Sequence, residues 1–489
     1  MSIEDLRQAF GPCFDPPEIR QLVDEVLAGV FSPDDAFVLP KEGNTFELEK
    51  SGGSPLADVL TEVQRKVVAA AIHSRHPWAI AHMCPPPLTA SVIADLLIGA
   101  MNQCAFIWEE APVASAIETA CLRWLSARLG FNGVASGLIT SGGTMSNCIA
   151  THLARVRARR SRIVDMSQLC IVASDQAHVS IRKAAAFIGL PSDAVCWIPT
   201  DGRGRLQPGM VEETTQRACH AGKIPFLFIC TAGTTNAGIL EPVDEFLAAS
   251  RKIGAWCHVD AAHGGLMSLS RGSGEHSARW AEADSVSWDP HKSLYVSYAL
   301  GCLILRDGEK ELAPLDFRCE YALKGESSCD PGRFHLDGSR RFDALKLWMV
   351  IKYLGESGLS DLVNYSLFLT SKLAANIRAL HDFSLITSPD TNIVVFRFNP
   401  AGCTARLLDN LNLRIQKRLF SKGGPLISST VMGGRTVLRA VIQNPFLEPR
   451  HLEAILEEIR KVGLHELNSN NWVHPEAQNE DRFGYQPSS

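Results

Sequence analysis

The chain has 489 residues, of which 46% are hydrophobic and 21% charged, a composition typical of a globular protein with a large core. Collagen-like, fibrous and disordered classes are excluded. The net charge is only −5, which gives no support to binding of nucleic acid or of an anionic membrane. The fourteen cysteines lack metal-ligand spacing, and so long a chain needs no disulfide framework, so they predict reduced thiols in a cytoplasmic protein without a metal site.

The N-terminal part predicts a helical arm. Its first residues mix acidic and basic side chains, and no apolar run approaches the ~20 residues of a membrane span, so we expect neither a signal peptide nor a transmembrane segment. From about residue 18 to 72 apolar positions recur at helical spacing, interrupted by segments with proline and glycine. We assign this arm to residues 1–75.

Helical and strand patterns alternate after Pro77. Segments 91–105 and 113–129 have helical periodicity, and short apolar runs between helices are typical of a mainly parallel sheet covered on both faces. The predicted strands are 137–139, 170–173, 225–231, 256–259, 285–287 and 301–305. This α/β pattern defines a large domain, residues 76–358.

The C-terminal part predicts a smaller α+β domain, residues 359–468. Two strand signals, 392–398 and 435–443, accompany helical patterns near 404–411 and 452–462. The polar segment 469–489 predicts a loosely ordered tail.

Five places after predicted strands carry unusual chemistry, and ligands of parallel sheets collect at the carboxyl ends of strands. The first is Thr140-Ser-Gly-Gly-Thr-Met-Ser-Asn147, whose small residues at a strand-to-helix turn expose backbone N–H groups suited to a phosphate. A plain turn with a helix cap is about equally compatible with it. It is neither a dinucleotide fingerprint nor a Walker A loop.

The other four places put single functional side chains at strand ends. His178 could stack on a flat ligand or be structural; Thr235 offers a hydroxyl; Asp260 is a functional carboxylate or a helix cap; Lys292, beside His291, would alone be read as a surface charge. Together, and in this order, they predict a pyridoxal 5′-phosphate site. Such a site needs a Schiff-base lysine, a carboxylate for the pyridinium nitrogen, a stacking group and a phosphate cup.

The sequence resembles the group II pyridoxal-phosphate-dependent amino-acid decarboxylases, the family of glutamate, aromatic-amino-acid, cysteine-sulfinate and diaminobutyrate decarboxylases. The motifs Ser174-Asp-Gln-Ala-His178, Val259-Asp-Ala-Ala262 and Pro290-His-Lys292 carry the resemblance, which extends from about residue 75 to 445. It implies an aspartate-aminotransferase-like (fold type I) α/β fold and decarboxylation of an L-amino acid to an amine and CO₂. It also implies a homodimer with active sites at the interface and an arm that wraps the partner.

By that resemblance Lys292 forms the Schiff base, His178 stacks on the ring, and Asp260 pairs with the ring nitrogen and keeps it protonated as an electron sink. Arg439 faces the substrate carboxylate or is a surface arginine, and Phe106 lines the substrate side or packs in the core. The remaining cofactor neighbours implied are Ser141, Gly143, Thr144, Thr235, Ala262, Ser287 and His291.

Two departures from the family lie next to these motifs. His263 stands where relatives have an aromatic residue, and it could tune the pocket or merely pack. Asp289 replaces the usual asparagine, and its charge would be unfavourable beside a phosphate unless it points away.

The third departure concerns the lid loop, which in many relatives carries a proton-donating tyrosine. No tyrosine lies between Lys324 and Arg340; the nearest substitutes are Phe334, His335 and, further back, Tyr321. In some relatives loss of that tyrosine accompanies oxidative decarboxylation–deamination to an aldehyde. A positioned histidine can also deliver a proton, so we predict simple decarboxylation with His335 as donor.

Other reactions remain open from the sequence alone. An aminotransferase or carbon–sulfur lyase on the same fold is an alternative, since a fold does not fix a reaction. A non-enzymatic scaffold is a further one, against which the retention of Lys292 and Asp260 argues. Nothing in the predicted pocket selects one amino acid.

Overall fold

A computed structural model describes residues 52–131, 136–161, 165–272, 278–317 and 331–469, together with residues 21 and 24. Its centre is a seven-stranded sheet in the order β1-β7-β6-β5-β4-β2-β3. Strands β2 to β6 run parallel, whereas β7 is antiparallel to both neighbours, β1 and β6. The strands are β1 (Ser136–Thr140), β2 (Leu169–Ser174), β3 (Val195–Ile198), β4 (Ile224–Thr231), β5 (Trp256–Asp260), β6 (Ser285–Trp288) and β7 (Gly301–Leu305).

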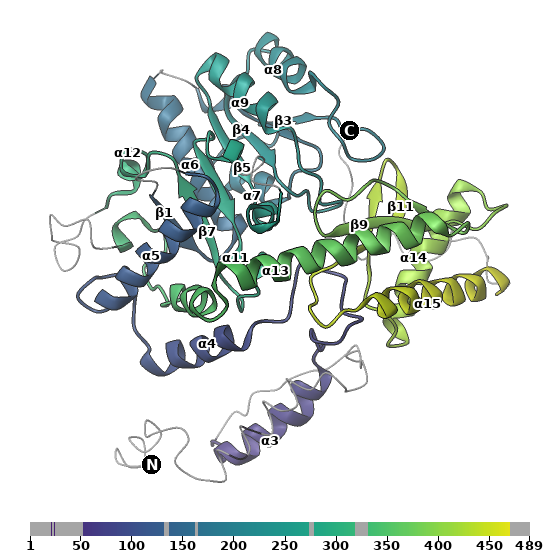
Figure 1. Cartoon of the computed structure of the whole chain (residues 1–489). Helices are drawn as coiled ribbons and strands as arrows, with labels where there is room; N and C mark the ends of the chain where they lie inside the picture. Colours follow the sequence, from purple (N-terminus) through teal and green to yellow (C-terminus); the bar gives the residue numbers. More distant parts are fainter. Residues whose placement is uncertain are drawn as a thin grey trace.

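Helices cover both faces of this sheet, as Figure 1 shows. One face packs on α6 and α7, and the other on α5, α8, α9 and the first part of α13. Because both faces are covered, every residue of β2, β5, β6 and β7 is buried, and the few polar side chains in β5 and β6, such as His258 and Ser285, are hydrogen-bonded within the core. The helices are α4 (Thr89–Met101), α5 (Pro112–Arg128), α6 (Gly143–Ser161), α7 (Ser180–Phe187), α8 (Met210–His220), α9 (Val243–Ile253), α11 (Pro290–Ser293) and α12 (Gly308–Leu312). The predicted, mainly parallel α/β architecture is confirmed.

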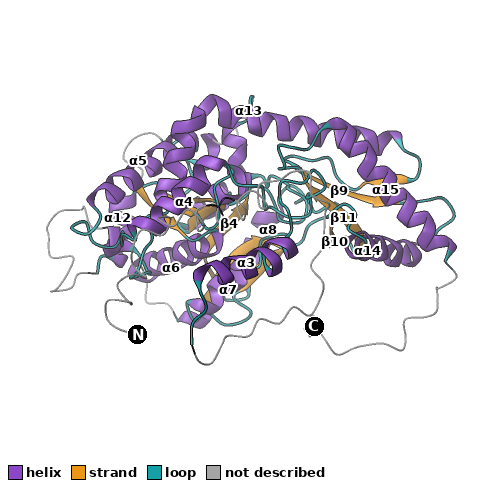
Figure 2. Ribbon diagram, turned by 90° about the horizontal axis from the view of Figure 1, so that it is seen from below, coloured by secondary structure: helices purple, strands orange, loops and turns teal. Residues whose placement is uncertain are grey.

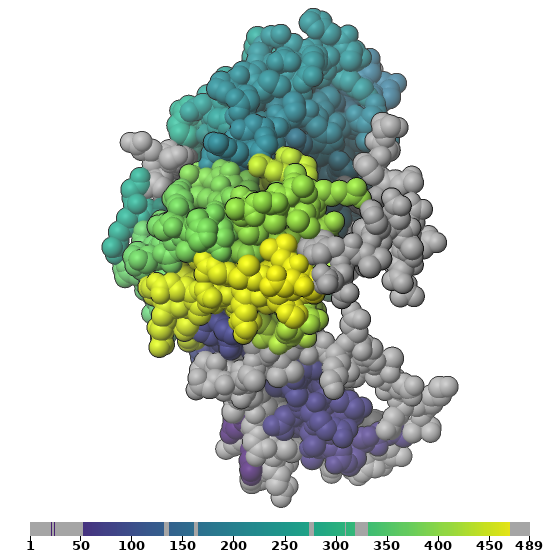
Figure 3. All heavy atoms as spheres, turned by 90° about the vertical axis from the view of Figure 1, so that its right-hand side faces the viewer, coloured from purple at the N-terminus to yellow at the C-terminus, as the bar shows by residue number. Residues whose placement is uncertain are grey.

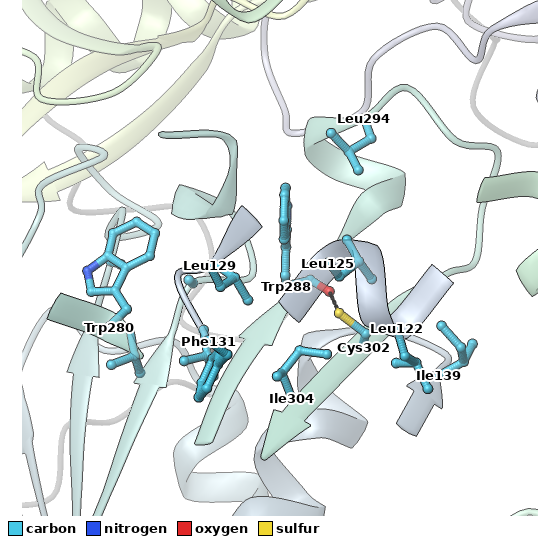
Figure 4. Packing of buried hydrophobic residues seen from close by; sticks show 14 of the residues in the cluster. Leu122, Leu125, Leu129, Phe131, Ile139, Trp280, Trp288, Leu294, Cys302 and Ile304 are labelled. Atoms are coloured by element: carbon cyan, nitrogen blue, oxygen red, sulfur yellow. Dashed lines mark hydrogen bonds between the residues drawn. The ribbon is translucent and has the colours of Figure 1, made fainter. Parts of the chain in front are cut away.

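The core beneath β6 and β7 fixes the segment that carries Lys292. Trp288 is fully buried at the end of β6, where its indole stacks on Trp124 at 6.4 Å between ring centroids. Its Nε1 donates to Ser293 Oγ at 2.6 Å, and its carbonyl accepts from Cys302 Sγ at 3.2 Å (Figure 4). The short helix α11 is therefore held at both ends by buried side chains.

The second sheet is antiparallel, in the order β10-β11-β9-β8, and packs on α14 and α15 (Figure 2). Helix α13 runs from the first sheet to the second, with one non-helical residue at Gly355 (φ 63°) near the predicted boundary at 358. The domain limits themselves stay a prediction. The elements are α13 (Ala344–Ala379), β8 (Phe383–Leu385), β9 (Ile393–Phe398), α14 (Ala405–Ser421), β10 (Ser428–Met432), β11 (Arg435–Val441) and α15 (Pro449–Asn468).

The described part of the predicted arm is helix α3 (Leu56–Lys66) and the turn that follows it. No residue of α3 is buried, and Figure 1 shows it apart from both sheets; its atoms lie at the lower end of the molecule in Figure 3. Most of the arm, the tail 470–489 and residues 318–330, which include Tyr321 and the first part of the predicted lid loop, lie outside the described residues. Among the described helices, none combines the length and apolar character needed to cross a membrane.

Candidate active site

A cavity of about 390 Å³ lies at the carboxyl ends of β1, β2, β4, β5 and β6. These strands point the same way, so the segments that follow them meet at one end of the sheet. The structure therefore brings together nearly all the predicted cofactor residues. Those that line the cavity are Ser141, Gly143, Thr144, His178, Thr235, Asp260, Ala262, His291 and Lys292.

The turn from β1 into α6 is shaped for close approach of a ligand. Gly142 has φ +149°, and a Cβ on Gly143 would lie 2.8 Å from Ala262 Cβ and 3.1 Å from Asp289 Oδ2. Larger residues would fill this space. The 19-residue helix α6 begins here, and its N-terminal N–H groups suit a phosphate.

Asp260 is buried at the end of β5, and both of its carboxylate oxygens accept hydrogen bonds. Its Oδ2 accepts from Asn147 Nδ2 at 2.8 Å, and its Oδ1 accepts from the Ala262 N–H and Ser287 Oγ, both at 3.2 Å. Burial raises the pKa of this carboxyl, but the neighbouring His258, the hydrogen bonds from Asn147 and Ala262, and the charge of Lys292 together outweigh burial, so the pKa lies below its ordinary value. Ser287 thus acts on the site through Asp260, and it does not line the cavity.

Lys292 pairs with Asp289, which lies three residues earlier in the chain and also lines the cavity. Its Nζ lies 2.8 Å from Asp289 Oδ2, with 24% of the lysine side chain and 1% of the aspartate side chain exposed. Burial lowers the pKa of the Lys292 amine, but Asp289 and Asp260 outweigh it and hold the pKa above its ordinary value. Asp289 therefore does not point away from the Gly143 turn. Its charge is balanced by Lys292.

His178 and His291 are neutral rings on the cavity wall. Burial lowers the pKa of both imidazoles. His178 Nδ1 lies 2.9 Å from Ser180 Oγ, while His291 Nδ1 accepts from the Leu300 N–H at 3.0 Å. Both rings are thereby held in fixed orientations.

The protein-family model described as "Pyridoxal-dependent decarboxylase conserved domain" matches residues 47–399. The chain belongs to this family. It is 33% identical over 431 residues to the L-2,4-diaminobutyrate decarboxylase of Rhizobium meliloti (strain 1021), a match that covers 84% of each chain. The decarboxylase fold also matches the crystal structure of mouse CSAD (TM-score 0.83, 28% identity, covering 92% of this chain and 99% of the other). The structure of Oryza sativa TDC with PLP and tryptamine matches at a TM-score of 0.85 and 25% identity, covering 96% of this chain and 99% of the other.

This protein is a pyridoxal-phosphate-dependent amino-acid decarboxylase, a carboxy-lyase with the fold type I architecture. The predictions of family, fold, enzyme class and cofactor are confirmed. The decarboxylase cavity also fits the cofactor chemically. It has a glycine cradle, an ionised carboxylate at Asp260 and a lysine amine.

Three more predicted site residues, in addition to Ser287, lie off the decarboxylase cavity. His335 is buried, with Nε2 3.5 Å from Glu118 Oε1, and Glu118 in turn receives both hydrogen bonds of Arg340 Nη2, at 2.8 and 2.9 Å. The Phe106 carbonyl accepts from the Gly332 N–H at 3.0 Å, so Phe106 lies against the same segment as His335.

Arg439, the third of these, adjoins the cavity without lining it. It is 6% exposed, and its Nε donates to the carbonyl of Thr235 at 2.8 Å, behind the cavity wall. Its Nη1 donates to the carbonyl of Ala81 at 2.9 Å. Burial lowers the pKa of its guanidinium to about 10, which leaves the group charged at neutral pH.

Tyr298, Met83 and Asn147 line the decarboxylase cavity and were given no role from the sequence. Tyr298 Oη donates to the carbonyl of Met83 at 2.8 Å, and its ring lies 4.5 Å from that of His291. For Tyr298, its position six residues after Lys292 was the one feature of the sequence that could have indicated a place in the cavity. His263, the departure next to Asp260, also lines the cavity, and its Nε2 lies 2.8 Å from Asn392 Oδ1.

Proposed function

We propose that Lys292 is the amine that binds pyridoxal phosphate covalently, with Asp260 at the ring nitrogen and His178 on the ring face. The Gly142–Gly143 turn, with Ser141 and Thr144, receives the phosphate. The observation that carries this proposal is that a lysine amine, an ionised carboxylate and a glycine cradle line one cavity at the carboxyl end of the sheet. The bound cofactor supplies an electron sink for the electrons released when CO₂ leaves.

The side chains divide the proton handling between them. Asp260, with its lowered pKa, stays ionised and holds a proton on the ring nitrogen. The Lys292 ammonium must lose a proton before its amine can react, and the Asp289 carboxylate, hydrogen-bonded to Nζ at 2.8 Å, favours the ammonium and so opposes this loss. His291 Nε2 lies 3.7 Å from the same carboxylate oxygen, and because Nδ1 accepts from the Leu300 N–H, the neutral ring carries its proton on Nε2, on the side of Asp289.

The substrate is an L-amino acid, and we propose Arg439 as the group that faces its carboxylate. The hydrogen bonds of Arg439 go to carbonyl and hydroxyl oxygens, with no carboxylate among its partners in the described part of the chain, so its charge is available to an anion. A basic substrate related to 2,4-diaminobutyrate is the first candidate, because the Rhizobium meliloti relative of that name reaches 33% identity, against 29% for an acidic-amino-acid and a cysteine-sulfinic-acid decarboxylase. Phe106 remains the proposed substrate-side wall.

We propose a homodimer as the assembly. The outer face of α4 exposes Ile93, Leu96, Leu97 and Met101 by 45–52% each, an apolar stripe that a second copy would cover. Phe106 follows this helix, and α3 has no buried residue in the single chain, which fits an arm that packs on a partner. A cytoplasmic location is supported by the eleven described cysteines, all of which are free.

Simple decarboxylation, with His335 as the proposed proton donor, competes with the aldehyde-forming reaction. A screen of L-amino acids for changes in the visible absorbance of the cofactor-loaded enzyme identifies the substrate. CO₂, amine, aldehyde and H₂O₂ are then measured in the same reaction. Equal amounts of amine and CO₂ support the proposal, and aldehyde with stoichiometric peroxide would overturn it in favour of the oxidative reaction.

A further inference from the structure

A chain of buried polar side chains runs beneath the cavity and ends at two of the proposed cofactor ligands. It starts in the core, where Trp256 Nε1 donates to Ser285 Oγ at 2.8 Å, and Ser285 Oγ lies 2.7 Å from His258 Nδ1. His258 Nε2 lies 3.0 Å from Asn147 Oδ1. Trp256, Ser285 and His258 are 0% exposed and Asn147 is 1% exposed, so water does not compete for these bonds.

The donors and acceptors in the first half of this chain have one consistent assignment. The Asp260 carboxylate only accepts, so Asn147 turns its NH₂ toward Asp260 and its Oδ1 toward His258, which leaves Nδ1 of the neutral His258 ring as an acceptor. Ser285 therefore accepts the indole N–H of Trp256 and gives its single proton to His258 Nδ1. His258 then carries its own proton on Nε2 and donates it to Asn147 Oδ1. Burial lowers the pKa of His258 to about 4, in keeping with a neutral ring that has one proton.

The amide of Asn147 is thereby oriented. With Oδ1 facing His258, both protons of Nδ2 are free for Asp260 Oδ2 at 2.8 Å and Ser180 Oγ at 2.9 Å. The reversed amide would place its oxygen against the Asp260 carboxylate and its NH₂ against the His258 N–H. Only one orientation satisfies all three neighbours.

Ser180 continues the chain to the ring of His178. Its hydroxyl accepts from Asn147 and donates to His178 Nδ1 at 2.9 Å, and the Ser180 backbone N–H also points at Nδ1, at 3.2 Å. His178 Nδ1 is therefore an acceptor, and its proton lies on Nε2. One amide group thus fixes both the carboxylate of Asp260 and the tautomer of His178.

We propose that Asn147 is a positioning residue that holds Asp260 and His178 in register with each other and with the glycine turn. Asp260 ends β5 and His178 follows β2, two strands that β4 separates in the sheet. Asn147 lies in the first turns of α6, the helix that starts at Gly143. Asn147 thus connects Asp260 and His178 to helix α6, whose N-terminus forms the glycine turn proposed for the phosphate.

This inference rests on the proposed roles of Asp260 and His178, and substitutions at Asn147 test it. N147A leaves space lined by polar partners in which a water can bridge, whereas N147L fills the space without any hydrogen bond. The measurements are the dissociation constant for pyridoxal phosphate and the circular dichroism of the bound cofactor. We expect about tenfold weaker binding in N147A and about tenfold weaker again in N147L, because hydrogen bonds to charged groups are lost without replacement.

A packing role predicts the opposite order, since leucine nearly preserves the volume of asparagine and alanine does not. N147L that binds the cofactor as well as N147A therefore overturns the proposal, as does wild-type affinity in both. If N147L does not fold, S180A is the deciding variant. It removes the connection from Asn147 to His178 and keeps the one to Asp260, so its affinity for pyridoxal phosphate must fall, but less than that of N147A. Wild-type affinity in S180A overturns the proposal.

Asn412 provides the matched control. It is also fully buried on a helix, but it bonds the backbone of Phe398 in the small domain, away from the cavity. N412A and N412L should lower thermal stability and leave the dissociation constant unchanged. D260A distinguishes failure of the proposed cofactor site from failure of the role of Asn147. Wild-type affinity for pyridoxal phosphate in D260A contradicts the proposed site. Weak binding by D260A together with strong binding by N147L contradicts only the role of Asn147.

Discussion

Replacing Asp289 by asparagine should speed the uptake of pyridoxal phosphate. In the structure Asp289 Oδ2 lies 2.8 Å from Lys292 Nζ and is almost fully buried, and it helps to hold the pKa of the Lys292 amine above its ordinary value. The reactive form is the neutral amine, so at neutral pH most of the lysine must first lose a proton. A charge-assisted hydrogen bond contributes about 1.5–3 kcal/mol, so losing it should raise the amine fraction, and the uptake rate at pH 7, about tenfold or more.

The pairing of Lys292 with Asp289 also determines how the rate of cofactor uptake changes with pH. A raised pKa keeps the ammonium dominant up to higher pH, so uptake by the wild-type chain should rise with pH. In D289N the rate should reach its plateau at a lower pH. The assay is stopped-flow absorbance of the cofactor mixed with cofactor-free enzyme, between pH 6 and 10.

Asp284 offers a control for this variant, because it is a buried carboxylate that pairs with Arg157 and Arg306 away from the cavity. D284N should destabilise the fold and leave the pH profile of uptake unchanged. Uptake by D289N that is equal to or slower than that of the wild type at pH 7 would refute the reasoning, because the pairing with Lys292 would then not limit the amine.

Two further variants test the substrate side. R439M should raise KM for the amino acid about 10–100-fold, through the loss of a charge-assisted contact with a carboxylate, and leave the affinity for pyridoxal phosphate unchanged; an unaltered KM contradicts the proposed role of Arg439. H335A should lower kcat about 100-fold with no change in cofactor affinity if His335 delivers the proton, whereas an unaltered kcat removes it from the reaction and leaves it as a buried partner of Glu118.

The sequence predicted the central sheet because its strands, buried on both faces, are short and mainly apolar segments between helical patterns. Strands β4, β5 and β7 lie within one residue of their predicted limits. Strand β3 was missed because it is a four-residue edge strand with three partly exposed positions. Strand β10 was missed because Ser428-Ser-Thr-Val-Met432 reads as polar.

The candidate site was predictable for a different reason. Its groups follow directly from strand ends, and parallel topology brings those ends together. Residues whose place depends on long-range packing were not predictable. Tyr298 reaches the cavity through its bond to Met83, 215 positions earlier, and His335 is drawn toward Glu118, far away in the sequence. A local pattern contains no information on either contact.

The most direct test of the account is the release of CO₂ from the L-amino acid that the screen identifies, measured with the wild-type enzyme and with K292A, both supplied with pyridoxal phosphate. The account predicts CO₂ and the corresponding amine in equal amounts from the wild type. It predicts neither product from K292A, together with loss of the visible absorbance of the covalently held cofactor. Undiminished CO₂ release by K292A, or a keto acid without CO₂ from the wild type, would contradict it.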